Sequence, residues 1–99
     1  MPREDFLGGR AVNSSVSITT AGATYSVPAS SVAYASLVLV CNDNSTADIY
    51  ILFSAANTVG ATKLSPGDNA AFRLAPSGVI YCYSPTATQT LNVTSKEIP

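Results

Sequence analysis

Turn-forming residues recur along the whole of this chain, and no window of eleven or more residues between them shows the 3.6-residue periodicity of a helix. The clearest turns are the Pro66-Gly67 pair and residues 75–78, which contain Pro76 and Gly78. Short runs rich in Val, Ile, Thr and Tyr lie between them, and several alternate apolar with polar residues. The pattern predicts an all-β fold, a small antiparallel β-sandwich or jelly-roll-like barrel of seven to eight short strands.

The chain has 99 residues, which predicts a single domain. We expect a β-sandwich over residues 11–99, preceded by an extended N-terminal arm at residues 1–10. The predicted tail, residues 96–99, is polar and loose. The clearest predicted strands cover residues 15–20, 24–27, 36–41, 48–53, 71–74, 79–83 and 89–95.

The arm combines charged residues with the apolar pair Phe6-Leu7, and Gly8-Gly9 behind them predicts a flexible joint. Two interpretations stay open. The arm is a frayed terminus, or Phe6 and Leu7 pack on a neighbouring subunit while Arg3 and Arg10 pair with acidic groups.

Residues 34–53 form the most apolar stretch, and their two runs separated by a polar segment predict a β-hairpin. Both faces of each run are apolar, which is typical of strands that are buried on both sides. A sandwich this small has one inner face, so another subunit, the arm or a long loop must cover the second. We assign Val38, Val40, Tyr50 and Leu52 to an oligomer interface, and a trimer is favoured over a dimer.

Composition excludes several functions. The net charge is −1 with no basic stripe, so we expect no nucleic-acid partner. Histidine is absent, which removes the commonest general base and metal ligand, and we expect neither an enzyme nor a cofactor. The start of the chain lacks the apolar core of a signal peptide, and no run could span a bilayer. We therefore expect synthesis in a cytoplasm and no membrane association.

Cys41 and Cys82 are the only cysteines, and their separation does not fit a metal site. We interpret them as reduced core residues that could be neighbours in space, with a late disulfide as the alternative. Asn42, Asp43 and Asn44 begin like a calcium loop, but the glycine and the distal glutamate are missing, so turn chemistry explains them better.

Residues 37–95 carry a series of short motifs in a fixed order. They are Val40-Cys41-Asn42, Asp48-Ile49-Tyr50-Ile51, Leu64-Ser65-Pro66-Gly67-Asp68, Val79-Ile80-Tyr81-Cys82-Tyr83 and Leu91-Asn92-Val93. This series resembles small β-sandwich virion proteins of tailed bacteriophages, which occur as head decoration or cement proteins and as domains of fibres and other virion parts.

The resemblance implies a non-enzymatic structural protein located in the virion, on the capsid surface. Its expected partners are copies of itself and the major capsid protein or another virion protein, which the arm would contact. The alternative is a fibre, tail or other virion module that recognises a host glycan or another virion protein. Tyr50, Tyr81 and Tyr83 are its candidate sugar-stacking residues, although packing in the core or an interface explains them better, since tyrosine is common in strands and tryptophan is absent.

Overall fold

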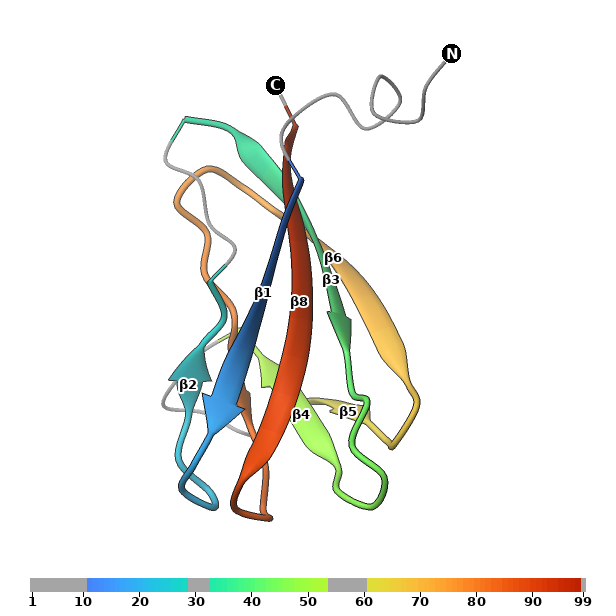
Figure 1. The fold of residues 1–99 in the computed structure, drawn as a ribbon. Coiled ribbons are helices and arrows are strands. Elements are labelled where there is room, and N and C mark those ends of the chain that lie inside the picture. Colours follow the sequence, from blue (N-terminus) through green and yellow to red (C-terminus); the bar gives the residue numbers. More distant parts are fainter. Residues whose placement is uncertain (1–10, 29–32, 54–60, 99) are drawn as a thin grey trace.

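The computed structural model describes residues 11–28, 33–53 and 61–98, which form two four-stranded antiparallel sheets packed face to face (Figure 1). The first sheet has the order β1-β8-β3-β6 and the second has the order β2-β7-β4-β5. These orders are those of a jelly roll, so the predicted all-β sandwich is confirmed. The first sheet consists of β1 Ala11–Ile18, β3 Ala35–Cys41, β6 Asn69–Leu74 and β8 Gln89–Ile98. The second consists of β2 Tyr25–Ser26, β4 Ile49–Leu52, β5 Thr62–Leu64 and β7 Tyr81–Tyr83.

The predicted hairpin between the two apolar runs of residues 34–53 is wrong. β3 pairs with β6 and β8, whereas β4 pairs with β5 and β7, so residues 42–48 carry the chain from one sheet to the other. The physical reason is that each run occupies a central position in its own sheet. A central strand has a hydrogen-bonded neighbour on both sides, and the most apolar strands fit best there.

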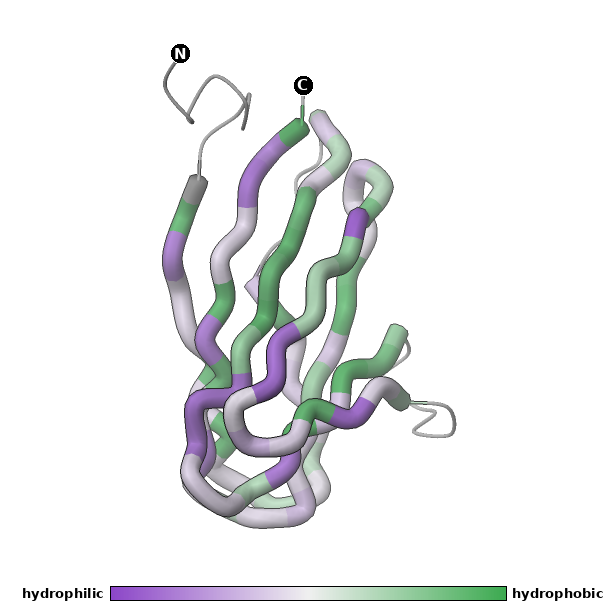
Figure 2. Tube along the Cα trace, turned by 90° about the vertical axis from the view of Figure 1, so that its right-hand side faces the viewer, coloured by the Kyte–Doolittle hydropathy of each residue, from purple (hydrophilic) through white to green (hydrophobic). Residues whose placement is uncertain are grey.

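The core is built from inward residues of the strands, together with Val27 and Ile80 beside β2 and β7. Hydrophobic residues run along the strands of both sheets (Figure 2). In β3 the inward residues are Val38 and Val40, and their side chains are fully buried. Alternation along the strand then points Leu37, Leu39 and Cys41 outward. The buried cluster comprises Val16, Ile18, Val27, Val38, Val40, Ile49, Ile51, Leu64, Leu74, Ile80, Cys82, Leu91 and Val93.

The C-terminal strand is longer than expected. β8 continues to Ile98, which pairs with Ala35, so residues 96–98 belong to the first sheet. The prediction of a loose tail is therefore wrong for these residues. Residues 92–96 of β8 pair with β1 on one side and with β3 on the other, so β8 joins the two strands in the first sheet.

The two predicted proline turns are confirmed. Asp68 donates its backbone N–H to the carbonyl of Ser65 at 2.9 Å, and Gly78 donates to the carbonyl of Ala75 at 2.8 Å. The third residue of each turn has a positive φ, 88° at Gly67 and 63° at Ser77. A proline at the second position with a positive φ at the third defines a type II turn.

Candidate interaction surfaces

The outer face of the first sheet carries two exposed leucines in the middle of a strand. Leu37 is 42% exposed and Leu39 is 39% exposed, and Cys41 follows them on the same side of β3. Ala71 of β6 lies beside Leu39 in the register. We call this surface the leucine face, and define it as the outward side of the first sheet from the level of Leu37 to the β3–β4 connection.

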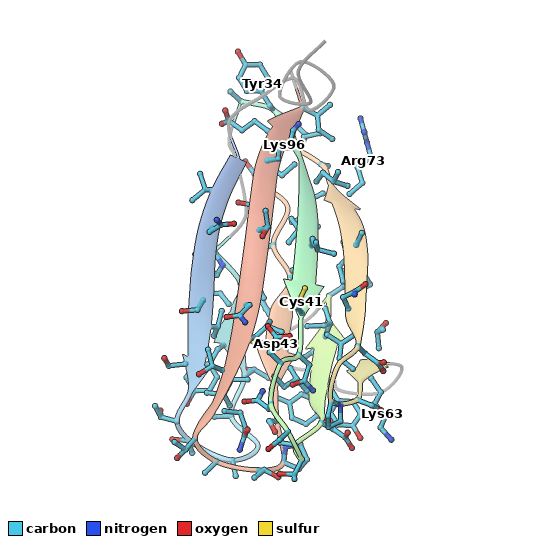
Figure 3. The ribbon with its side chains drawn as sticks, turned by 45° about the vertical axis from the view of Figure 1, so that its right-hand side comes forward. Tyr34, Cys41, Asp43, Lys63, Arg73 and Lys96 are labelled. Carbon is cyan, nitrogen blue, oxygen red and sulfur yellow. The ribbon has the colours of Figure 1, made fainter. Side chains whose placement is uncertain are left out.

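Charge is divided between the two ends of the leucine face (Figure 3). Arg73 of β6 and Lys96 of β8 flank Leu37 from either side. Lys96 is only 6% exposed, so Arg73 is the cation that a partner could reach at this end. At the other end, Asp43 follows β3 and its carboxylate accepts a hydrogen bond from the side-chain amide of Asn92 on β8. The face is therefore cationic at one end, apolar in the middle and anionic at the other.

Neutral polar side chains cover the rest of the leucine face. Thr94 donates its hydroxyl to the side-chain oxygen of Asn13 at 3.0 Å, which joins β8 to β1 on the outside of the sheet. Ser15 and Ser17 continue the outward side of β1. This half of the face is therefore polar, whereas the half around Leu37 and Leu39 is apolar.

The outer face of the second sheet is aromatic. Tyr50 of β4 and Tyr83 of β7 are register neighbours, and their rings stack with centroids 5.1 Å apart and planes 15° apart. Tyr81 lies on the same side of β7, next to Leu52. We call this surface the tyrosine face. At its edge, Lys63 approaches Asp48 with a nitrogen–oxygen distance of 3.7 Å.

The structure corrects the predicted oligomer interface. Val38 and Val40 lie in the core rather than on an outer face, because the register with β6 and β8 turns Leu37 and Leu39 outward. Leu52 points outward from the second sheet but is only 3% exposed, and Tyr50 is half-buried against Tyr83. β3 and β4 belong to different sheets, so these four residues do not form one surface.

The predicted contacts of the arm fall on Arg3, Phe6, Leu7 and Arg10, which lie outside the described residues. The boundary at residue 10 between arm and sandwich also stays a prediction. Sequence reasoning missed Leu37, Leu39 and Arg73 as surface residues. The only signal that could have found them is the alternation in β6, where Arg73 lies between the inward residues Phe72 and Leu74.

The two cysteines are free, as the first interpretation has it, and they lie on different sheets. Only Cys82 is a core residue, so the placement of Cys41 in the core is wrong. Cys82 belongs to the core, and burial raises the pKa of its thiol to about 11. A buried thiol with a raised pKa is a poor nucleophile. Cys41 is partly exposed on the leucine face, where the first sheet separates it from the core.

Among residues 11–28, 33–53 and 61–98, no group of three or more Cys, Asp or Glu side chains lies close enough to hold a metal ion. Asn42 and Asn44 instead form the expected turn, since the backbone N–H of Asn44 donates to the side-chain oxygen of Asn42 at 3.1 Å. The described part of the chain contains no helix that is long and apolar enough to cross a membrane.

No model of a known protein family matches the chain. A search of curated proteins likewise finds no significant match. Among solved structures, the chain is similar to a subunit of Bacillus endospore appendages, which form disulfide-linked pili. The two chains are 16% identical, with a TM-score of 0.51, and the match covers 92% of this chain and 91% of the appendage subunit. This likeness concerns the fold, which the two chains share over nearly their whole length.

Proposed function

We propose that this protein is a non-enzymatic structural subunit of a phage virion that associates with copies of itself. Its most specific role would be that of a capsid decoration protein, which binds the assembled head and stabilises it. The observation that carries the proposal is the leucine face, where Leu37 and Leu39 are exposed in the centre of a regular sheet. Contiguous exposed apolar residues bounded by polar ones are typical of protein–protein contact sites.

Decoration would work by mass action. A protein that binds the assembled lattice and not its separate subunits stabilises the lattice by an amount that grows with its free concentration. The arm would provide the second contact, either to the shell or to a neighbouring subunit. We expect heads that lack this protein to break at lower temperature and under weaker osmotic shock than complete heads. Equal resistance of the two preparations would refute the decoration role.

Self-association has its own test. Light scattering on the purified protein should give a mass above that of one 10.2 kDa chain, and the mass should rise with concentration. A protein that stays monomeric up to millimolar concentration would contradict the proposed self-association. Support for an assembling subunit comes from the similar fold of the Bacillus appendage subunit, which builds a pilus.

The second candidate is a binding module of a fibre or tail, and the tyrosine face favours it. Tyr50, Tyr81 and Tyr83 share the outward side of two neighbouring strands, and aromatic residues that combine an apolar ring with a hydroxyl suit both protein and sugar partners. A glycan array would measure sugar binding by the wild-type protein and by a Tyr50→Ala variant. Binding that the variant loses supports this role, and no signal from the wild-type oligomer would rule out a glycan.

A further inference from the structure

We propose that two copies of this chain pack through their leucine faces with the two β3 strands antiparallel. In this arrangement, which rests on the proposed self-association, the end of each face that carries Arg73 lies over the end of the partner's face that carries Asp43. Leu39 of each copy packs over the partner's Cys41. The occupant of the leucine face is thus a second leucine face.

Charge complementarity decides the direction of packing. Arg73 lies at the level of Leu37 in the sheet register, whereas the carboxylate of Asp43 is held over β8 near the level of Asn92. If the two β3 strands were parallel, Arg73 would meet the cationic end of its partner and Asp43 the anionic end. Antiparallel strands bring each cationic end onto an anionic end, and unlike charges across an interface fix its register.

The symmetry follows from the same register. A two-fold axis in the plane of the interface, crossing the strands midway between Leu39 and Cys41, exchanges the two copies. Each β3 then lies over the partner's β3, and every contact occurs twice. Such an isologous interface closes on itself, which is the commonest arrangement of homodimers. The sequence alone had favoured a trimer.

The area of the leucine face indicates how strongly the two copies would bind each other. Four strands about 4.8 Å apart give a width of roughly 19 Å, and the outward positions extend over roughly 25–30 Å. Each copy would therefore bury on the order of 500–600 Å², which places the pair at the lower limit of stable interfaces. We expect a dimer that dissociates on dilution.

Cys41 provides a native probe of this geometry. Packed sheets lie about 10 Å apart, and the proposed axis shifts the two Cys41 residues by two positions along the strand, so their Cα atoms are roughly 12 Å apart. That distance is too long for a disulfide, which requires Cα atoms within about 7 Å, but a short bismaleimide can bridge it. Cys82 does not interfere, because it is fully buried.

The first experiment treats the folded protein with a short bismaleimide. We expect a covalent dimer from the wild type, and no cross-link from a variant that combines Cys41→Ser with Leu37→Cys. In the antiparallel packing the two residues 37 are roughly 20 Å apart along the strands. Cross-linking of this variant as efficient as that of the wild type would show parallel strands and overturn the proposal. Oligomers that scatter light but do not cross-link through Cys41 would also overturn it, while leaving self-association intact.

The second experiment uses matched surface substitutions and measures the dissociation constant by analytical ultracentrifugation. Leu39 and Val79 are equally exposed, at 39%, but Val79 lies next to β7, away from the leucine face. We expect Leu39→Ser to weaken the dimer at least tenfold and Val79→Ser to leave it unchanged. The reverse result, or an equal effect of both, would place the interface elsewhere.

A charge exchange completes the test. Arg73→Glu should weaken the dimer, and adding Asp43→Arg should restore part of the lost affinity, because the facing ends of the two copies again carry unlike charges. Lys63→Glu, the same change of charge on the other sheet, is the control. Circular dichroism confirms that each variant is folded. A dissociation constant that Arg73→Glu leaves unchanged, or a double variant that dimerises more weakly than the single one, would overturn the proposed charge arrangement. A wild-type protein that stays monomeric would overturn the proposed self-association itself.

Discussion

Asn42 shows how much of this fold depends on one buried side chain. Its amide nitrogen donates to the carbonyl oxygens of Ala47 and Leu64, each at 2.8 Å. Its side-chain oxygen accepts from the backbone N–H and the side-chain amide of Asn44. These four bonds satisfy the full capacity of an asparagine side chain. They fasten the connection between the two sheets to the end of β5.

We predict that Asn42→Ala destabilises the protein by about 3 kcal/mol, because two buried carbonyl oxygens would lose their donor. Chemical denaturation followed by circular dichroism would measure the loss. The control is Asn13→Ala on the exposed side of β1, which should cost less than about 0.5 kcal/mol. Similar losses for the two variants would show that Asn42 has no special role.

The thiol of Cys82 predicts a pH dependence of stability. Burial raises its pKa from the ordinary value of 9.0 to about 11 in the folded chain. The unfolded chain therefore releases this proton first as the pH rises, and stability falls between about pH 9 and pH 11. A shift of this size corresponds to a loss of roughly 3 kcal/mol.

The measurement compares the wild type with Cys82→Val, in which no thiol titrates at this position. The free energy of unfolding would be followed from pH 8 to pH 11 in both proteins. We expect the wild type to lose more stability than the variant over this interval, and parallel curves would contradict the prediction. All other titratable groups are common to both proteins, so their contributions cancel in the difference.

At the scale of elements, the two proline turns can be compared directly, because they have the same turn type and differ in the third residue. Both need a positive φ at the third residue, which glycine adopts freely and serine does not. The first turn has Gly67 there, with open space around it, and the second has Ser77. Backbone strain alone thus distinguishes the two positions.

We predict that Gly67→Ser costs about 1 kcal/mol, since it places a side chain in the left-handed region. Ser77→Gly relieves the same strain but adds entropy to the unfolded chain, so its effect should lie within about 0.5 kcal/mol of zero. Thermal unfolding of both variants would measure the difference. Equal effects at the two positions would contradict the assignment of strain to Ser77.

The elements also show what the sequence could and could not predict. The β1 stretch alternates apolar and hydroxylated residues, so Val16 and Ile18 are placed in the core from the pattern alone. In β3 both faces are apolar, so the pattern cannot decide which pair faces the core, Val38 and Val40 or Leu37 and Leu39. That choice depends on Arg73 and Thr94, which lie beside the leucines only after β6 and β8 have paired with β3. The bonds of Asn42 to Ala47 and Leu64 depend on tertiary contacts in the same way.

At the scale of the whole molecule, self-association links stability to concentration. If the folded chain dimerises and the unfolded chain does not, unfolding must also break the dimer, and the midpoint temperature rises with protein concentration. We expect an increase of a few degrees between 5 µM and 500 µM protein for an interface at the lower limit of stable size. Differential scanning calorimetry would measure it. Leu39→Ser should reduce the increase, and a wild-type midpoint that is independent of concentration would argue against dimerisation.

The pairing of β1 with β8 has a practical consequence for engineering. Ala11 and Lys96 are register neighbours, so the chain enters and leaves the sandwich at the same pole (Figure 1). The β1–β2, β3–β4 and β7–β8 connections gather at the opposite pole. A tag or carrier fused near either end would therefore sit far from a peptide inserted at residues 85–88. The domain could serve as a two-ended display scaffold, anchored at one pole and presenting an epitope at the other.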